Sequence, residues 1–248
     1  MAVIDTGIDN DHPDLGVTGG VNFVRIGRRV NPNAWDDDNG HGTHVAGIIA
    51  ARDNDIGVVG VAPGASLYAV KVLNANGSGY YSDIIAGLQW CINSDAPIHV
   101  VNMSLGGTSD SPAMESACIA ARDKKIFLVA AAGNSGGGVI YPAAYESVIA
   151  VAATDKSDVR ASWSCFGEEI DIAAPGVNIY STYKGGGYTT MSGTSMASPH
   201  VAGTLALSLD VDKLLSTADD LGDHGLDIYY GNGLVDAEEA ATGFQTNP

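Results

Sequence analysis

The chain has 248 residues, of which 45% are hydrophobic and 17% are charged, and this balance excludes a disordered chain. Twelve basic residues against 29 acidic ones give a formal net charge of −17, so no nucleic-acid partner is expected. The sequence contains no run of 18 apolar residues and no signal peptide, so neither a membrane-spanning helix nor a membrane partner is predicted.

Predicted strands and helices alternate along the chain. Apolar runs predict strands at residues 2–4, 67–72, 98–102, 126–131 and 148–152. Helical spacing of apolar residues predicts helices at 44–52, 81–92, 112–123 and 197–209. This alternation is typical of βαβ units, so we expect an α/β fold whose mostly parallel sheet carries helices on both faces. No Pro-rich or Ser-rich linker divides the chain, and one domain over residues 1–248 is the simplest interpretation.

The chain has three cysteines, Cys91, Cys118 and Cys165, which cannot all pair within one molecule. Buried thiols are the ordinary interpretation, although Cys91 and Cys118 lie on neighbouring predicted helices and could touch. Cysteine usage therefore does not decide between an oxidising and a reducing compartment.

Three short segments carry the residue types of a serine-hydrolase triad. Asp5 ends the first predicted strand, His41 lies among glycines in NGHG, and Ser195 lies in GTSMA before an apolar helix. Each has a structural alternative, namely an Asx turn, a helix-start histidine and a helix-cap serine. A serine hydroxyl becomes a nucleophile only when a neighbouring base takes its proton. The order Asp, His, Ser differs from that of chymotrypsin-like proteases (His, Asp, Ser) and α/β-hydrolases (Ser, Asp, His).

A fourth candidate, Asn134, lies in AAAGNSG after the predicted strand at 126–131. Its side-chain amide could donate to a developing oxyanion beside the Ser195 N–H, and a turn asparagine is the alternative. Asp5, Ser104 and Asn134 each follow a predicted strand. Ligands bind beyond the carboxyl ends of parallel strands, so these residues predict a site at that edge of the sheet.

The chain resembles the catalytic domain of subtilisin-family serine proteases, the subtilases. The resemblance rests on VIDTGID at 3–9, HPDL at 12–15, NGHGTHVAG at 39–47, GVAP at 60–63, NMSLGG at 102–107, AAGN at 131–134, APG at 174–176 and GTSMASPHVAG at 193–203. It implies a subtilisin-like three-layer α/β/α fold and a serine endopeptidase that acts on polypeptides. It also implies Asp5, His41 and Ser195 as the triad, with Asn134 as oxyanion donor.

The resemblance further implies where a substrate lies. An extended substrate strand is expected between two segments, Ser104-Leu105-Gly106 and Gly77-Ser78-Gly79. Tyr81 and Ile84 match positions of the S4 subsite, and one wall of S1 is matched by Ala131, Ala132 and Gly133. Ile140 matches the floor of S1, where the family often carries a small or polar residue, so we predict a preference for small or medium P1 side chains.

Structural calcium is a further implication of the resemblance. Its expected ligands are the side chains of Asp14 and Asn54 and the carbonyls of Arg52, Ile56 and Val58, all oxygen donors that suit Ca²⁺. An ordinary polar loop is the alternative. The adjacent carboxylates Asp36, Asp37 and Asp38 repel one another, and either solvent or a second cation would relieve that repulsion.

The beginning of the chain departs from the family pattern, because subtilases usually carry a longer segment before the motif that contains Asp5. We expect a chain that lacks this segment and a propeptide partner that lies outside it. A secreted monomer is the expected form, with an acidic intracellular subtilase as the alternative. A calcium-stabilised binding module without proteolysis is the alternative function, and an esterase or peptide ligase with the same triad is a third.

Overall fold

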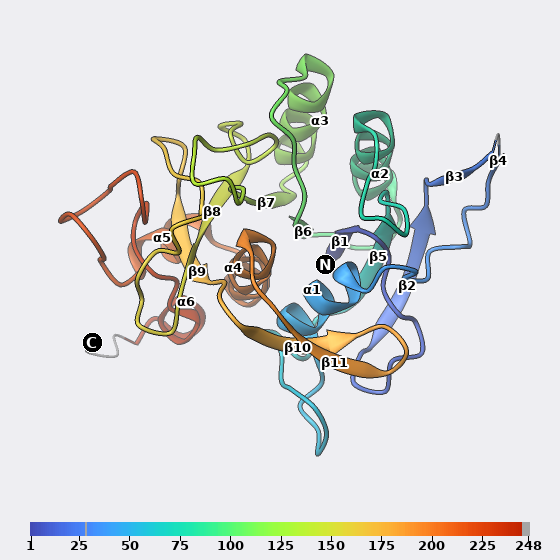
Figure 1. The fold of residues 1–248 in the computed structure, drawn as a ribbon, viewed down its shortest axis with the longest axis horizontal. Helices are drawn as coiled ribbons and strands as arrows, with labels where there is room; N and C mark the ends of the chain where they lie inside the picture. The colour runs from blue at the N-terminus through green and yellow to red at the C-terminus, as the bar shows by residue number, and fades with distance from the viewer. Residues whose placement is uncertain (28, 245–248) are drawn as a thin grey trace.

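Seven parallel strands form the centre of the molecule, in the order β2-β5-β1-β6-β7-β8-β9 (Figure 1). A computed structural model of the chain describes residues 1–27 and 29–244. The strands are β1 (Ala2–Asp5), β2 (Val17–Asn22), β5 (Leu67–Lys71), β6 (Val100–Met103), β7 (Phe127–Ala131), β8 (Ile149–Thr154) and β9 (Ile172–Pro175). Two small antiparallel pairs lie outside this sheet, β3 (Arg25–Ile26) with β4 (Arg29–Val30), and β10 (Ile179–Tyr183) with β11 (Gly187–Met191).

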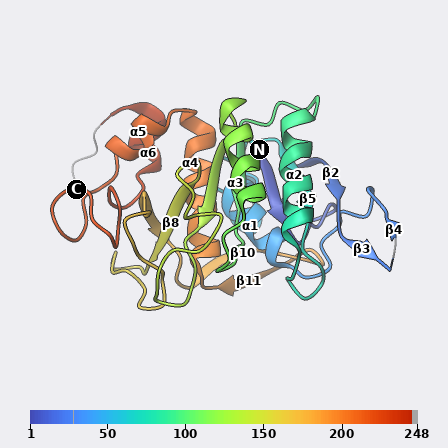
Figure 2. The same cartoon turned by 90° about the horizontal axis from the view of Figure 1, so that it is seen from above.

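Helices cover both faces of the sheet, which gives three layers (Figures 1 and 2). The helices are α1 (His41–Ala50), α2 (Tyr81–Asn93), α3 (Pro112–Asp123), α4 (Thr194–Ser208), α5 (Val211–Ser216) and α6 (Ala237–Thr242). One apolar core joins α2 and α3 to one face, and a second core joins α1 and α4 to the other. The expected three-layer α/β/α fold with a parallel sheet is confirmed.

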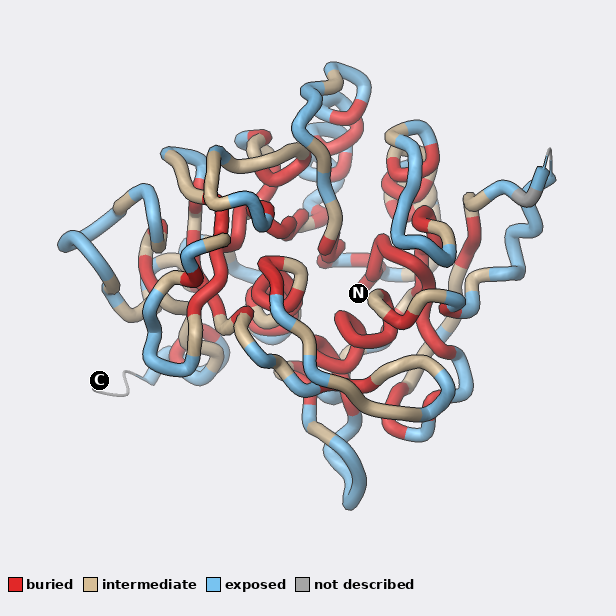
Figure 3. Tube along the Cα trace, in the orientation of Figure 1, coloured by how far each residue is buried: buried red, intermediate tan, exposed pale blue. Residues whose placement is uncertain are grey.

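The central strand β1 explains how these layers form. Ala2 and Ile4 belong to the core under α2 and α3, whereas Val3 belongs to the core over α1 and α4. Alternate side chains point to opposite faces of a strand, so a strand covered on both faces is apolar throughout. The buried stretches in Figure 3 follow this sheet and the inward faces of its helices.

The hairpin of β10 and β11 connects the two helices that carry the candidate histidine and serine. Thr182 Oγ1 donates to the Thr43 carbonyl at 2.8 Å, and Ser181 Oγ donates to the His44 carbonyl at 2.8 Å, so β10 is fixed to α1. β11 ends at Met191, shortly before α4 begins at Thr194. The hairpin therefore ties the start of α1 to the start of α4.

The predicted elements are present, but two helices begin earlier than their apolar patterns indicated. α1 begins at His41 after its N-cap residue Gly40, and Asp37, three residues before Gly40, supports this start by accepting hydrogen bonds from the N–H groups of Gly40 at 2.8 Å and Thr43 at 2.9 Å. α4 begins at Thr194 rather than at residue 197. The sequence analysis missed β2, whose centre is glycine, and the edge strand β9, which ends in Pro175.

All three cysteines are free and buried, so Cys91 and Cys118 do not form a disulfide. Burial raises the pKa of each of these two thiols to about 12, which makes them poor nucleophiles. No helix in the described part of the chain is long and apolar enough to cross a membrane.

Candidate active site

Asp5 and His41 are joined by a short hydrogen bond at the carboxyl end of the central strand. The distance from Asp5 Oδ1 to His41 Nδ1 is 2.7 Å, and the same oxygen accepts the Thr6 N–H at 2.7 Å. The Asp5 side chain is fully buried, whereas the His41 side chain is 20% exposed. A buried carboxylate holds one nitrogen of the ring and leaves the rest of the imidazole open to the cleft.

Glycine allows α1 to approach the end of β1 closely enough for this bond to form. A Cβ atom at Gly42 would lie 2.1 Å from the Gly7 carbonyl oxygen and 3.1 Å from Asp5 Cβ, so no larger residue fits without movement. The Gly42 N–H donates to Thr6 Oγ1 at 2.9 Å, and that hydroxyl donates to Asp37 Oδ1 at 2.9 Å. The first turn of α1 is thus hydrogen-bonded directly to the residue that follows Asp5.

The charge around His41 favours its protonated form. Burial alone lowers its pKa, but the charge of Asp5, the hydrogen bond that the ring donates to Asp5 and the charge of Asp37 together raise the pKa above its ordinary value. His44, one turn further along α1, contacts the backbone carbonyls of Ile179 and Thr189 through Nε2 and has no carboxylate partner among the described residues. Burial lowers the pKa of His44 to about 4, so that ring is neutral near pH 7.

Ser195 lies in the first turn of α4, where backbone N–H groups have no partner within the helix. Its hydroxyl donates to the Ser104 carbonyl at 3.2 Å, and the Ser104 hydroxyl donates to the Ser195 carbonyl at 2.7 Å. Within the described residues the Ser195 hydroxyl is therefore directed at Ser104 rather than at His41. Catalytic hydrogen bonds are often long or misaligned without substrate, and rotation about one side-chain bond redirects this hydroxyl.

Asn134 is held beside the start of α4 by Thr194. The Asn134 Oδ1 atom accepts hydrogen bonds from the Thr194 N–H at 2.8 Å and from Thr194 Oγ1 at 2.9 Å. With its oxygen fixed in this way, the exposed side chain has only its NH₂ group left to donate. A Cβ built at Gly193 would lie 3.5 Å from Asn134 Nδ2, so the amide lies next to the segment that carries the candidate nucleophile Ser195.

A cleft of about 720 Å³ is lined by His41 and Ser104, whereas Ser195 and Asn134 are not among its lining residues. His41 is part of its wall, and the two expected substrate edges face it. The lining residues are Thr6, Asn39, His41, Leu73, Gly77, Ser78, Gly79, Tyr81, Ile84, Ser104, Leu105, Gly106, Gly107, Thr108 and Ser109. The structure thus brings both predicted edges and both predicted S4 residues to the same cleft as His41.

Tyr81 lines the cleft. Its hydroxyl donates to the Ser109 carbonyl at 2.6 Å, which connects α2 to the loop after Ser104. Burial and the nearby charge of Asp110 raise the pKa of Tyr81, so the phenol stays protonated and continues to donate.

Ile140 lies close to the predicted substrate edge and to the predicted S1 wall. A Cβ at Gly106 would lie 2.6 Å from Ile140 Cδ1, and a Cβ at Gly133 would lie 3.2 Å from both Ile140 Cγ atoms. Gly106 belongs to the predicted substrate edge, and Gly133 belongs to the predicted S1 wall of Ala131, Ala132 and Gly133. One branched side chain is therefore close to both segments at once, and its role as the floor of S1 stays a prediction.

The loop at 52–58 surrounds Asp14, whose side chain is fully buried. Asp14 Oδ1 accepts from Asn54 Nδ2 at 2.9 Å, and Oδ2 accepts from the Val58 N–H at 3.1 Å. A further donor that the sequence analysis missed, the Tyr188 hydroxyl, contacts Oδ2 at 3.1 Å. The loop closes over the carboxylate at Gly57 (φ +63°), where a Cβ would lie 2.4 Å from Asp14 Oδ2.

These residues are suitable oxygen donors for a cation. In the described part of the chain, no hydrogen bond ends on the carbonyls of Arg52, Ile56 or Val58, so all three oxygens are available as ligands. The Asn54 oxygen instead accepts the Ile56 N–H at 2.8 Å. The residues fit a hard cation once the Asn54 amide turns its oxygen toward Asp14.

The contacts of Asp36, Asp37 and Asp38 give no support to the second cation that their adjacency suggested, which stays a prediction. Asp37 accepts hydrogen bonds from the cap of α1, and Asp38 Oδ1 lies 2.6 Å from Lys71 Nζ. Asp36 Oδ1 accepts the Asn10 N–H at 3.2 Å. Each carboxylate thus has its own partner, and no group of three acidic, cysteine or histidine side chains in the described residues could hold a metal.

Sequence reasoning missed three residues that hold the site together. Thr194 orients Asn134, Asp37 supports the start of α1, and Lys71 is buried beside Thr6. Thr194 lies within the same motif as Ser195, so its position was available as a signal. For Lys71 no pattern in the sequence indicated burial, because a lysine at the end of a strand is ordinarily solvated.

Comparisons of the sequence with known proteins show the family of this chain. A family model described as the subtilase family, Peptidase_S8, matches residues 1–233. The chain belongs to the subtilase family. This subtilase is 50% identical to Subtilisin DY of Bacillus licheniformis over 256 residues, which covers 97% of this chain and 90% of that relative.

Two further proteases are similar to this chain over nearly its whole length. Subtilisin Savinase of Lederbergia lenta is 50% identical over 251 residues, covering 97% of this subtilase and 89% of the relative. A thermostable alkaline protease of Halalkalibacterium halodurans is 50% identical over 97% of this chain, which spans 66% of that relative's length. By family, this subtilase is a serine endopeptidase.

Proposed function

We propose that this subtilase hydrolyses peptide bonds within extended polypeptides, with Asp5, His41 and Ser195 as its triad. The observation that carries the proposal is the 2.7 Å bond between Asp5 Oδ1 and His41 Nδ1 on the wall of the cleft. That bond assigns Nδ1 as the protonated nitrogen and leaves Nε2 as the base. The buried carboxylate also stabilises the imidazolium that forms when the ring takes a proton.

The reaction begins when the Ser195 hydroxyl leaves the Ser104 carbonyl and turns to His41. Ser195 Oγ attacks the scissile carbonyl carbon while His41 Nε2 takes its proton. The imidazolium then gives this proton to the leaving amine, and a water molecule repeats the sequence on the acyl-enzyme. Asn134 Nδ2 and the Ser195 N–H donate to the oxyanion, and the hold of Thr194 on Asn134 supports this assignment.

Substrate binds as an added strand between two backbone edges. The segments at 77–79 and 104–106 face one cleft, and main-chain hydrogen bonds to such edges give affinity without reading side chains. Selectivity is then left to the subsites. The position of Ile140 close to Gly106 and Gly133 supports a shallow pocket that prefers small or medium P1 side chains.

Calcium is part of the proposal as a structural ion. The side chains of Asp14 and Asn54 and the carbonyls of Arg52, Ile56 and Val58 would hold it, and when bound it would fix the exposed loop at 52–58. The family resemblance also supports secretion, a propeptide partner during folding and a monomeric mature enzyme. The net charge of −17 keeps an acidic intracellular subtilase as the alternative location.

The proposed function is tested by labelling with a serine-directed fluorophosphonate and by digestion of a peptide library. We expect wild type to be labelled and to cleave internal peptide bonds, and Ser195→Ala to do neither. Loss of the serine in subtilisins themselves lowers kcat on the order of 10⁶-fold, and this family value is the expectation here. Folded wild-type protein that takes no label would instead favour the binding module without proteolysis.

A further inference from the structure

Lys71 is a buried lysine at the end of β5, directly beside the catalytic strand. Only 4% of the residue is exposed, and in the parallel pairing of β1 with β5 it is the register partner of Asp5. A buried ammonium group is costly unless hydrogen bonds and an opposite charge compensate it. The acceptors of the three Lys71 N–H donors therefore indicate which segments this residue holds together.

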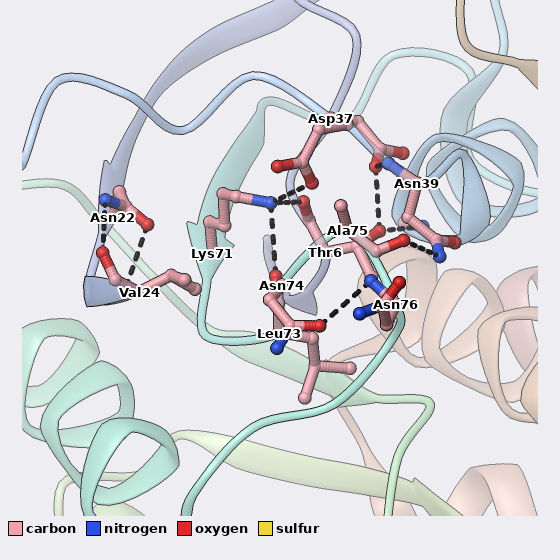
Figure 4. Close-up of polar contacts among 12 residues, drawn as sticks. Thr6, Asn22, Val24, Asp37, Asn39, Lys71, Leu73, Asn74, Ala75 and Asn76 are labelled. Carbon is pink, nitrogen blue, oxygen red and sulfur yellow. Dashed lines mark hydrogen bonds and ion pairs between the residues drawn. The ribbon is translucent and has the colours of Figure 1, made fainter. Parts of the chain in front are cut away.

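The three donors of Lys71 reach three different segments (Figure 4). Nζ donates to the Thr6 carbonyl, to the Leu73 carbonyl at 3.1 Å and to Asp38 Oδ1 at 2.6 Å. Thr6 follows Asp5, Leu73 begins the loop that leads to one substrate edge, and Asp38 lies three residues before His41. One ammonium group thus joins the segments that carry the catalytic aspartate, the catalytic histidine and the substrate edge.

Asp38 supplies the opposite charge from the rim of the site. Its side chain is 54% exposed, whereas that of Lys71 is 5% exposed, so the carboxylate reaches inward from solvent. Within the described residues it is the one acidic side chain at ion-pair distance from Lys71. The Asp38 carbonyl also accepts from Lys184 Nζ at 2.6 Å, which fixes the backbone of the same loop.

The next residue in that loop is part of the cleft itself. Asn39 lines the cleft, and its Nδ2 atom donates to the Ala75 carbonyl at 2.9 Å, across to the segment before Gly77 (Figure 4). Asn39 Oδ1 accepts the His41 N–H at 3.1 Å. Movement of Asp38 would therefore pass directly to the wall of the cleft on which His41 lies.

We propose that Lys71 and Asp38 form a positioning ion pair that sets the distance between the His41 loop and the substrate edge at 77–79. Neither residue touches the reacting atoms. The pair acts by holding the cleft wall in the conformation that accepts an extended peptide. The inference rests on the proposed function, because it concerns the substrate of the same cleft.

Asp38→Asn tests the pair, and Asp36→Asn is its matched control. Both changes remove one carboxylate from an exposed position in the same loop, but the Asp36 carboxylate accepts from the Asn10 N–H and forms no ion pair with a lysine or arginine among the described residues. Two substrates are compared, a tetrapeptide anilide that occupies S1 to S4 and a single-residue acetylated ester that occupies S1 alone. For Asp38→Asn we expect the KM of the tetrapeptide to rise about fivefold to tenfold, because small displacements of a cleft wall weaken extended substrates.

The ester should keep its KM and kcat in both variants, and Asp36→Asn should match wild type on both substrates. Asp38→Glu, which restores a carboxylate, should recover most of the tetrapeptide KM. Lys71→Met should raise that KM by the same factor as Asp38→Asn, and the double variant should add nothing, because both changes remove one interaction. If Lys71→Met does not fold, the Asp38 variants decide the matter alone.

Two results would overturn the proposal. The first is an Asp38→Asn enzyme whose tetrapeptide KM equals that of Asp36→Asn. The second is an equal loss of kcat on both substrates, which would show a smaller folded fraction rather than a displaced cleft wall. Wild-type enzyme that cleaves neither substrate would instead contradict the proposed function, so the two failures are distinguishable.

Discussion

Ser104 and Ser195 are hydrogen-bonded to each other in both directions. The Ser195 hydroxyl donates to the Ser104 carbonyl at 3.2 Å, and the Ser104 hydroxyl donates to the Ser195 carbonyl at 2.7 Å. The same Ser104 hydroxyl accepts from Asn102 Nδ2 at 2.9 Å, and Asn102 Oδ1 accepts from Ser198 Oγ at 2.7 Å. The start of α4 is therefore fixed to the end of β6 by a buried chain of polar groups.

Ser104→Ala keeps the Ser104 carbonyl that accepts from the Ser195 hydroxyl, but it removes the Ser104 hydroxyl. The Ser195 carbonyl and the Asn102 amide each lose a partner, so we expect the free energy of unfolding to fall by about 1–3 kcal/mol. Activity should fall severalfold in kcat, since the first turn of α4 is less firmly held. Denaturant unfolding and steady-state kinetics measure the two effects. Unchanged stability would mean that water replaces the hydroxyl.

Thr194→Val tests how Asn134 is oriented. The variant loses the side-chain bond to Asn134 Oδ1 at 2.9 Å and the bond from the Gly133 N–H at 3.1 Å, but it keeps the backbone bond at 2.8 Å. We expect kcat to fall about tenfold with little change in KM, which corresponds to about 1.4 kcal/mol of transition-state stabilisation.

Asn134→Ala is the reference for that experiment. In subtilisins themselves, loss of this donor costs about 10²–10³ in kcat, and the same range is the family expectation here. The double variant should be no slower than Asn134→Ala, because Thr194 acts through Asn134. A further tenfold loss in the double variant would assign Thr194 some other role.

The pKa of His41 can be measured directly in the inactive Ser195→Ala protein. The charge and hydrogen bond of Asp5, with the charge of Asp37, outweigh burial, so NMR titration should place the pKa of His41 above the ordinary 6.5. His44 should titrate near 4 in the same spectra, because burial dominates there. Since the base must be neutral, kcat/KM should fall about tenfold per pH unit below the His41 value.

Asp5→Asn should reverse the direction in which the pKa of His41 is shifted. In Ser195→Ala combined with Asp5→Asn, the carboxylate is gone while the burial remains, so the pKa of His41 should drop below 6.5. His44 serves as the internal control and should not move. A His41 pKa above 6.5 in the double variant would show that Asp37 alone provides the favourable charge.

Ile140→Gly should open the S1 pocket. Removal of the side chain that lies close to Gly106 and Gly133 creates room for an aromatic P1 residue, so the ratio of kcat/KM for Phe over Ala should rise tenfold or more. Ile140→Val, which removes one methylene, should raise the ratio only slightly. A peptide panel in which wild type already favours Phe over Ala would contradict the shallow pocket.

Removal of calcium should destabilise the enzyme through the loop at 52–58. A ligand at about 100 times its dissociation constant contributes about 2.7 kcal/mol, so EDTA should lower Tm by roughly 5–10 °C. Asp14→Asn should abolish the difference between calcium and EDTA, whereas Asp53→Asn in the same loop should retain it. An EDTA effect of equal size in Asp14→Asn would locate the ion elsewhere.

The sequence was sufficient to predict the fold class and most of the central strands, because these depend on local patterns, whereas the reacting groups stay a prediction. Apolar runs gave the central strands, and Asp5, His41 and Asn134 lie where those strands and their helices place them. The supporting contacts could not be predicted, since they join residues distant in the chain. Lys71 and Asp38 are 33 positions apart, and nothing local to either residue indicates the other.

The acidic residues at 36–38 show that neighbours in the sequence need not share one site. Three adjacent carboxylates suggested shared repulsion, but the chain turns so that Asp37 faces the helix and Asp38 faces Lys71. Adjacent residues in a turn point in different directions, and only the three-dimensional path reveals which partners they meet.

The central position of β1 has a consequence for when activity appears during synthesis. Its residue Ala2 pairs with Tyr68 on one side and with Val101 on the other, and Ser195 lies still later in the chain. Long-range parallel pairing of this kind forms slowly. Asp5 and its proposed base His41 thus precede the proposed nucleophile Ser195 by most of the sheet, because strands β5 to β9 lie between them in the chain. A chain that ends before Ser195 would lack the proposed nucleophile.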